Sequence, residues 1–204
     1  AYQVLTQELM RFCTVDLGAG YLDMTKDRLY TLRAENPARR SAQTAMYWML
    51  EVLVRAFAPI LSFTADEIWS YLPARAHDSA LFATWTDLDP ISDLALDARG
   101  QVLMDDLAAL RTATLRQIET LRNAGQLGGS LEADVEIGVD AAARAELAPC
   151  AEELRFYFIT SDVRLVDGAG PDAVVLGAGR ASVRVSATTA PKCVRCWQHR
   201  ADVG

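Results

Sequence analysis

The stretch NPARRSAQTAMYWMLEVLVRAFAPILSFTADEIW, residues 36–69, decides the fold class of this chain. From Ala45 onward its apolar residues recur at every third or fourth position, the spacing that places them on one face of an α-helix. Asn36 and Pro37 are typical of a helix start, as N-cap and first helical residue. Because proline cannot continue a helix, we expect this one to end or kink at Pro59.

A second helix is predicted directly after Pro59. Thr64 and Glu67 stand three positions apart, the spacing of a capping box. The apolar run over residues 45–63 raises the question of a membrane span, but it contains Glu51 and Arg55. Each charge at the centre of a membrane costs about 2.5–3.5 kcal/mol, so a helix buried in a protein core is the better interpretation.

Helical periodicity also covers the flanking sequence. We expect helices over residues 1–13, 21–32 and about 101–123, with Gly18 and Gly20 interrupting the chain between the first two. The residues of the last helix that should face inward are Leu103, Leu107, Leu110, Leu115, Ile118 and Leu121.

After residue 125 the pattern changes to short strands. Residues 133–139 alternate, with Val135, Ile137 and Val139 on one face, and residues 163–168 and 181–187 predict two more strands. Residues 141–161 are partly helical. The expected fold class is therefore mainly α, with a helical part followed by a small α+β unit.

Composition limits the partners and the setting. The net charge is −7, with a pI of about 4.9, which argues against a broadly basic nucleic-acid-binding protein. Residues 1–74 carry seven Lys and Arg against eight Asp and Glu, so an anionic partner would dock more readily there. Four cysteines, two of them as Cys-x-x-Cys, do not indicate a disulfide framework and favour a reducing, cytoplasmic setting. Because the first residue is Ala1 rather than Met, we expect a piece of a longer protein.

Two groups of residues are candidates for contacting RNA. Arg39 and Arg40 open the central helix, with Tyr47 further along it, and guanidiniums beside an aromatic ring suit RNA backbone and bases. The alternative is a solvated helix end. The second group is Lys26, Arg28 and Tyr30, for which local ion pairs with neighbouring aspartates are the alternative.

Cys193 and Cys196 have the spacing of two zinc ligands. A redox pair or chance are the alternatives, and the redox pair lacks the βαβ setting that it needs. His77 and His199 belong to no serine–base–acid pattern, and no glycine loop has phosphate-binding spacing, so we predict no catalytic residue.

Read together, YLDMTKDRLYT, residues 38–69, GGSLEADV and KCVRCWQHRADVG resemble the C-terminal third of the bacterial isoleucyl-tRNA synthetases, class I enzymes. The resemblance covers most of the chain. It implies a helical-bundle anticodon-binding domain over residues 1–125, a small α+β junction domain over residues 126–190, and the first half of a zinc-binding segment over residues 191–204.

The resemblance also implies cofactors and partners. Cys193 and Cys196 match the first of two Cys-x-x-Cys pairs that hold zinc in the intact enzyme, and the second pair is absent, so no zinc is expected on this piece. The HIGH and KMSKS signatures of the ATP site are missing too. The implied partners are tRNA(Ile) and the catalytic and editing domains of the same polypeptide, with no membrane and no DNA.

Two other interpretations remain open from the residues. One is the anticodon-binding module of a valyl or related class I synthetase, whose downstream sequence would be a coiled-coil arm. The other is a helical protein-interaction scaffold with a cysteine tail. Comparing the binding of tRNA(Ile) with that of a non-cognate tRNA would distinguish the scaffold interpretation from the synthetase interpretation.

Overall fold

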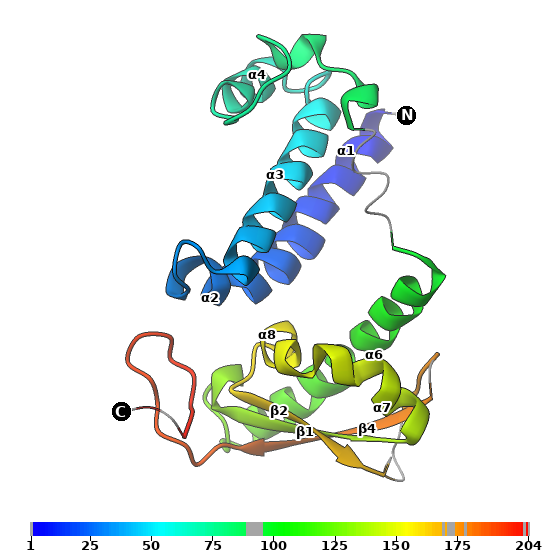
Figure 1. Ribbon diagram of the computed structural model, residues 1–204, viewed down its shortest axis with the longest axis vertical. Helices are drawn as coiled ribbons and strands as arrows, with labels where there is room; N and C mark the ends of the chain where they lie inside the picture. Colours follow the sequence, from blue (N-terminus) through cyan, green and yellow to red (C-terminus); the bar gives the residue numbers. More distant parts are fainter. Residues whose placement is uncertain are drawn as a thin grey trace. The chain divides into compact units, whose positions relative to one another are not determined.

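The computed structural model describes residues 2–88, 96–168, 170, 174–177, 179–201 and 203. The chain divides into two compact units: a sheet unit, Ala1–Thr31 with Asp97–Gly204, and a helical unit, Leu32–Leu96. Helices predominate and the sheet unit holds one small sheet, which confirms the mainly α prediction (Figure 1). In the described ranges, no helix combines the length and the hydropathy needed to cross a membrane.

The long helix of the helical unit begins and ends where the sequence predicts. α3 runs over Pro37–Phe57, and the Asn36 side chain caps it by accepting a hydrogen bond from Ala38 N at 2.9 Å. It ends just before Pro59. The remaining elements of this unit are α4 (Ser62–Ser70) and the 3₁₀ turns η2 (Ala80–Phe82) and η3 (Trp85–Leu88).

The capping box predicted at the start of α4 was wrong. The N-cap is Leu61, which makes no side-chain cap, and its carbonyl accepts the first helical bond from Ala65 N at 2.8 Å. The helix therefore begins earlier than expected, directly after the turn at Pro59. Thr64 falls inside the first turn, where its side chain is not placed to cap.

A small core anchors the polar segment that follows α4. Trp69 is 1% exposed and packs with Val54, Ala58 and Ala65. Its indole Nε1 donates to His77 O at 2.8 Å. The segment after Pro73 was predicted to be a loop or hairpin, and its described part forms turns fastened to this tryptophan; residues 89–91 of that prediction lie outside the described residues.

The first helices of the sheet unit are continuous. α1 (Tyr2–Arg11) passes through a π-helical segment, η1 (Phe12–Leu22), into α2 (Asp23–Thr31). The predicted interruption at Gly18 and Gly20 was therefore wrong. A Cβ on Gly18 would lie 3.0 Å from Cys13 O, so the missing side chain lets the wider π turns close instead of breaking the helix.

The sheet has four strands in the order β2-β1-β4-β3. β1 pairs in parallel with β2 and antiparallel with β4, and the short β3 pairs antiparallel with β4. A parallel pair needs a crossover, and the helices α7, η5 and α8 supply it between β1 and β2. The bounds are β1 (Ala133–Val139), α7 (Ala141–Leu147), η5 (Ala148–Glu153), α8 (Leu154–Phe158), β2 (Asp162–Asp167), β3 (Val174–Val175) and β4 (Arg180–Ala187).

The core of this unit lies between the sheet and α6 (Ala98–Asn123), so the predicted strand face and the predicted helix meet. Ile137 of β1 and Leu110 of α6 are both 0% exposed. Leu115 was predicted to face inward and is 45% exposed. Thr114 takes that inward position instead, because it continues the helical spacing from Leu110.

Candidate nucleic-acid interface

Two of the residues predicted to contact RNA lie exposed on α2. The ring of Tyr30 is largely in solvent, at 80% exposure. Lys26 Nζ lies 2.7 Å from Asp23 Oδ1, which is the local ion pair that its spacing indicated. An exposed pair of this kind contributes little to stability, so Lys26 can exchange Asp23 for a phosphate.

Arg28 of α2 points instead to the crossover helices. Its guanidinium forms an ion pair with Glu153 of η5 and lies 5.1 Å from the centre of the Phe156 ring. Burial lowers the pKa of Arg28 from its ordinary value. This side chain therefore ties α2 to α8 within the sheet unit.

The other three residues lie on α3 of the helical unit. Arg40 is exposed, and its Nη1 donates to Gln43 Oε1 at 3.2 Å. Arg39 is half-buried, and its Nη1 donates to Leu32 O at 2.9 Å, which fastens the turn before the helix. The adjacent arginines thus have different surroundings.

Tyr47 is engaged inside the helical unit. Its hydroxyl donates to Ala74 O at 2.9 Å, and its ring meets Trp48 edge-on with 5.3 Å between centroids. Burial, together with a hydrogen bond to Glu51, raises the pKa of Tyr47 to about 12. This phenol is therefore neutral at physiological pH.

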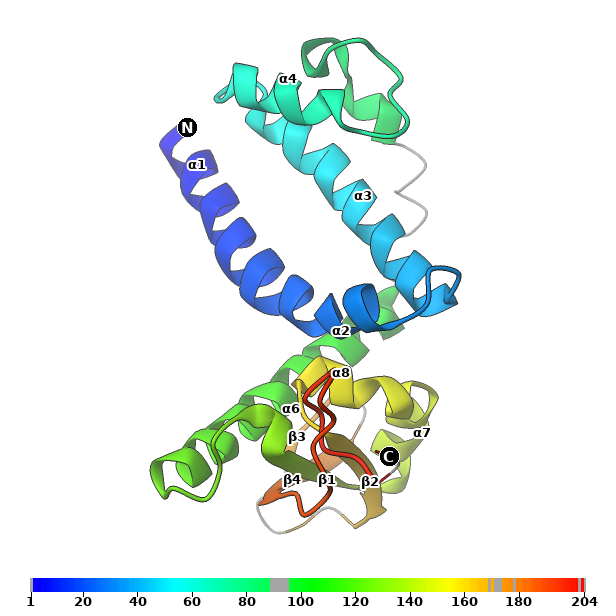
Figure 2. The same ribbon diagram turned by 90° about the vertical axis from the view of Figure 1, so that its left-hand side faces the viewer.

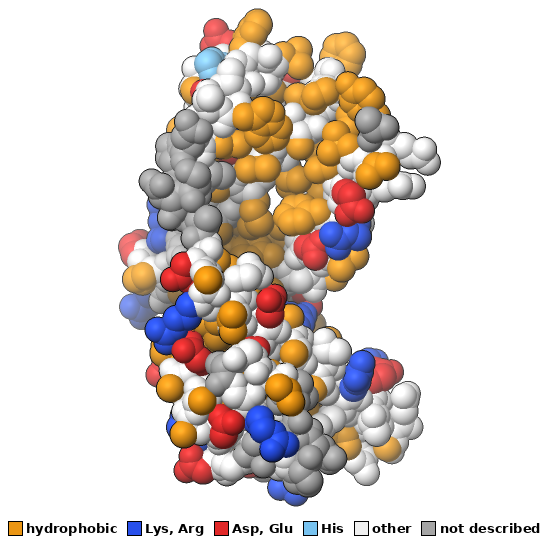
Figure 3. All heavy atoms as spheres, turned by 90° about the vertical axis from the view of Figure 1, so that its right-hand side faces the viewer, with side chains coloured by type: hydrophobic (Ala, Val, Ile, Leu, Met, Phe, Trp, Pro, Cys, Tyr) orange, Lys and Arg blue, Asp and Glu red, His pale blue; other side chains and the backbone are white. Residues whose placement is uncertain are grey.

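The six predicted residues thus divide into exposed side chains, Lys26, Tyr30 and Arg40, and side chains held by the protein, Arg28, Arg39 and Tyr47. Three of the six lie on α2 of the sheet unit, and the other three lie on α3 of the helical unit. On the face shown in Figure 3, apolar side chains gather over one part, and acidic and basic side chains lie near one another over the rest.

Cys193 and Cys196 lie in a tight turn that we call the cysteine turn, residues 192–199. The turn is closed by an antiparallel bridge between Lys192 and His199 and by a bond from Trp197 N to Cys193 O at 2.9 Å. Trp197 has the positive φ of 63°, a conformation that side chains other than glycine rarely adopt. The two thiols therefore sit in one sharply folded loop.

Backbone amides surround the sulfur of Cys193. Hydrogen bonds from the amides of Cys196 and Arg195 lower the pKa of the Cys193 thiol. Burial raises the pKa of Cys196, although the amide of Gln198 bonds its sulfur. Amides directed at sulfur stabilise thiolates, which are the form that binds metals.

The chemistry of this donor set fits half of a zinc site. Two thiolates on one turn match half of a tetrahedral four-cysteine site. Among the residues that the structure describes, no group of three His, Cys, Asp or Glu side chains is placed to hold a metal ion. His199 Nδ1 donates to Ala190 O at 2.8 Å, and its buried Nε2 has no hydrogen-bond partner among the described residues.

The cysteine turn is docked on the sheet unit through a residue that the sequence did not single out. The Gln198 side chain is buried and bonds both α2, at Asp27, and α8, at Arg155. Arg195 Nη2 also donates to Thr31 O at 3.3 Å. In Figure 2 the segment that carries this turn runs beside α8. Nothing local marks Gln198, because its partners are 171 and 43 residues away.

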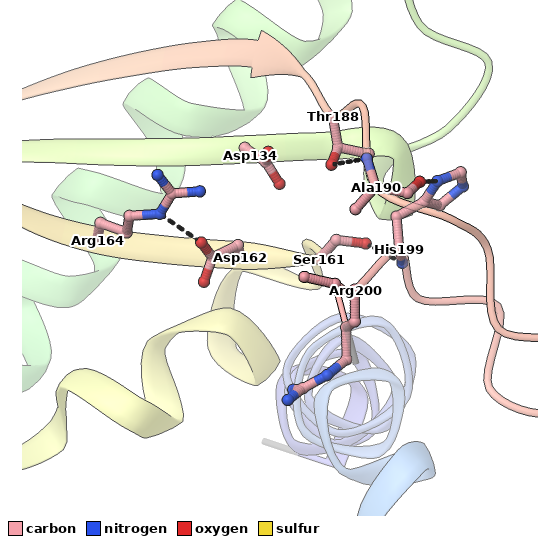
Figure 4. Close-up of a pocket in the computed structure, with 9 residues that line it drawn as sticks. Asp134, Ser161, Asp162, Arg164, Thr188, Ala190, His199 and Arg200 are labelled. Atoms are coloured by element: carbon pink, nitrogen blue, oxygen red, sulfur yellow. Dashed lines mark hydrogen bonds and ion pairs between the residues drawn. The ribbon is translucent and has the colours of Figure 1, made fainter. Parts of the chain in front are cut away.

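A polar pocket of about 360 Å³ lies where the tail returns to the sheet (Figure 4). Asp134 and Asp162 are paired neighbours on β1 and β2, and Arg164 Nε lies 2.6 Å from Asp162 Oδ2. Ser161 Oγ accepts from the backbone N of His199 at 2.6 Å rather than contacting its ring. This arrangement holds the tail in place and does not form a serine–histidine relay. None of the six predicted RNA-contacting residues lines it.

Comparison with known proteins identifies relatives over almost the whole chain. It is 46% identical over 202 residues to the isoleucine–tRNA ligase of Xanthomonas axonopodis pv. citri (strain 306) and 47% identical over 201 residues to that of Xylella fastidiosa (strain M12). Each match covers 98% of this chain but 20% of the relative, so the chain spans about a fifth of the length of these relatives. The family described as the anticodon-binding domain of tRNA ligase matches residues 1–137. The chain therefore belongs to the anticodon-binding domain family of tRNA ligases.

Proposed function

We propose that this chain is the anticodon-arm-binding part of an isoleucine–tRNA ligase, which attaches isoleucine to tRNA(Ile) using ATP. The observation that carries this proposal is the 46–47% identity to proteins of that name over 98% of the chain. Because the ATP-site signatures are missing from this sequence, catalysis and editing would belong to other domains of the same cytoplasmic polypeptide.

The proposed domains keep the limits inferred from the sequence. Residues 1–125 would bind the anticodon arm, residues 126–190 would form the junction, and residues 191–204 would begin the zinc-binding segment. The compact units divide the chain differently, since α6 shares its core with the sheet. The junction would therefore be built on the last helix of the RNA-binding domain.

The proposed RNA contacts are Lys26, Arg28, Tyr30, Arg39, Arg40 and Tyr47. Lys26 and Arg40 would neutralise phosphates, and the exposed ring of Tyr30 would stack on an unpaired base of the anticodon loop. Arg28, Arg39 and Tyr47 would act mainly by holding the structure of their own units, because each has a polar group that already bonds within its unit.

Cys193 and Cys196 would supply two thiolates to a zinc ion in the longer enzyme, and the other two ligands would come from beyond this chain. When bound, zinc would cross-link the segment as a structural ion. The closed turn that holds both cysteines supports this role, because it places the two thiols in one loop.

The test is filter binding of the 204-residue chain to tRNA(Ile) and to a non-cognate tRNA across a range of salt concentrations. We expect tighter binding of tRNA(Ile), with Arg40→Glu weakening it and reducing the salt slope by about 1. Arg184→Glu is the matched control, since Arg184 is an exposed arginine on β4. Equal binding of both tRNAs would reject the isoleucine assignment, and no binding of either would favour the protein-interaction scaffold.

A further inference from the structure

Gln198 joins three separate parts of the sheet unit. Its Nε2 donates to Asp27 Oδ2 of α2 at 2.7 Å, and its Oε1 accepts from Arg155 Nη1 of α8 at 3.1 Å. The residue is 5% exposed. A neutral amide matches these two partners, because it presents a donor to the carboxylate and an acceptor to the guanidinium.

The backbone of Gln198 holds the cysteine turn at the same time. Its carbonyl accepts from Cys193 N at 2.8 Å. One buried residue therefore bonds the first cysteine of the pair through its main chain and both supporting helices through its side chain. Rotation of that side chain would break its bonds to both α2 and α8 and release the cysteine turn from the two helices.

We propose that Gln198 is the positioning residue of the Cys193–Cys196 pair, which holds the cysteine turn on α2 and α8 in the shape that presents both thiolates to a metal ion. The proposal rests on the structural zinc role proposed above. Outer partners that orient metal ligands typically change metal affinity by 10–100-fold when they are removed. Gln198 would be such a partner, because it bonds α2 and α8 through its side chain and the cysteine turn through its carbonyl.

Substitutions of Asp27 test the same hydrogen bond from the other partner. Asp27→Ala removes the acceptor for Gln198 Nε2, whereas Asp27→Asn keeps an oxygen in that place. If Gln198 acts through Asp27, Asp27→Ala should reproduce part of the Gln198→Ala effect and should not add to it in the double variant. Asp27→Asn should behave nearly as the wild type.

The experiment uses two readouts, hydrogen exchange on the 204-residue chain and cobalt binding by the longer ligase. The first is amide hydrogen exchange at Cys193 and Trp197, whose N–H groups close the turn. The second is Co²⁺ titration of the zinc-free longer ligase, which would supply the other two ligands, followed by the thiolate-to-cobalt absorption. Gln126→Ala is the matched control, because Gln126 is an exposed glutamine in the same unit.

We expect Gln198→Ala to accelerate exchange of both amides at least about tenfold and to weaken Co²⁺ binding about tenfold, with no change in Gln126→Ala. Unchanged exchange in Gln198→Ala would overturn the proposal. Faster exchange with unchanged Co²⁺ affinity would also overturn it, since Gln198 would then only dock the tail. If the wild type shows no thiolate-to-cobalt absorption, the zinc assignment itself fails, and the exchange data show separately whether Gln198 holds the turn.

Discussion

Arg55 and Asp87 lie 32 residues apart in the sequence, and Arg55 Nη2 is 3.4 Å from Asp87 Oδ2 within the helical unit. Arg55 also donates from Nε to Thr84 O at 3.0 Å and forms an ion pair with Glu51, one turn earlier on α3. Both residues of that pair are buried. One buried guanidinium thus bonds two residues of the polar segment after α4, Thr84 and Asp87, to α3.

Removing Arg55 should destabilise the helical unit strongly. Arg55→Met leaves Glu51 buried without its partner, which typically costs about 3–5 kcal/mol of unfolding free energy. Urea unfolding followed by tryptophan fluorescence measures this, because Trp69 lies against the same guanidinium. The double variant Glu51→Gln with Arg55→Met should recover part of the loss. A loss below about 1 kcal/mol in Arg55→Met would show that the pair is solvated.

Acid should weaken the cap of α7. Asp140 accepts from Ala143 N at 2.9 Å and from Arg180 N at 2.8 Å, and the Ala143 bond is the main cause of its lowered pKa. Because the folded pKa lies below the unfolded value of about 3.9, the stabilisation is complete above that value and is lost as pH falls through the folded pKa. Asp140→Asn should therefore be less stable than wild type at pH 7.

The stability difference between Asp140→Asn and wild type should shrink as pH falls and disappear under strongly acidic conditions. Urea unfolding at a series of pH values gives this comparison. Asp105→Asn, an exposed aspartate on α6, serves as the control. A difference that does not depend on pH would contradict the role of the ionised Asp140 carboxylate.

Gln117 should protect an edge of the sheet. From α6 its amide donates to Val183 O at 2.6 Å and accepts from Val185 N at 3.0 Å, in the place where a neighbouring strand would bond β4. Gln117→Leu should cost about 2 kcal/mol, at about 1 kcal/mol for each lost bond. The exposed edge should also promote self-association.

Sedimentation velocity at several concentrations tests the self-association of Gln117→Leu. The control is Gln126→Leu, which adds the same apolar group at an exposed position. A monomeric Gln117→Leu with unchanged stability would mean that the two bonds are replaced by water.

The two tyrosines predicted to contact RNA should behave differently. Tyr30→Ala should leave the fold intact and weaken tRNA binding by about 1–3 kcal/mol, the usual value for stacking on one base. Tyr47→Phe should instead lower the unfolding free energy by about 1 kcal/mol, because it removes the bond to Ala74 O. Parallel binding and unfolding curves separate the effects. A Tyr30→Ala chain that binds tRNA normally would remove Tyr30 from the interface.

Replacing Thr160 should stabilise the sheet unit. Thr160 is 0% exposed, and its Oγ1 has no hydrogen-bond partner among the residues that the structure describes. Thr160→Val keeps the shape and removes a hydroxyl whose burial costs about 1–3 kcal/mol when it is not bonded. Thermal unfolding should show a higher midpoint. A lower midpoint would show that the hydroxyl bonds a water in the small cavity that it lines.

Much of the architecture could be read from neighbouring residues. The cap at Asn36, the end of α3 before Pro59 and the inward face of β1 were predicted correctly, because helix caps and periodicity depend on residues a few positions apart. The errors have a different origin. Thr114 rather than Leu115 faces inward, because packing of α6 on the sheet selects that face. Gly18 lies within a continuous π-helical segment, because the backbone closes across the turn where the glycine has no side chain.

The sequence by itself therefore determined the order and type of the elements, the family and the presence of a cysteine pair. Only the tertiary structure decided which candidate side chains are exposed and which are already bonded. Arg39 and Arg40 are adjacent in sequence, yet one fastens a turn and the other faces solvent. Gln198 acquires its role from Asp27, 171 residues earlier. Such contacts depend on how distant segments close on each other, which no local pattern encodes.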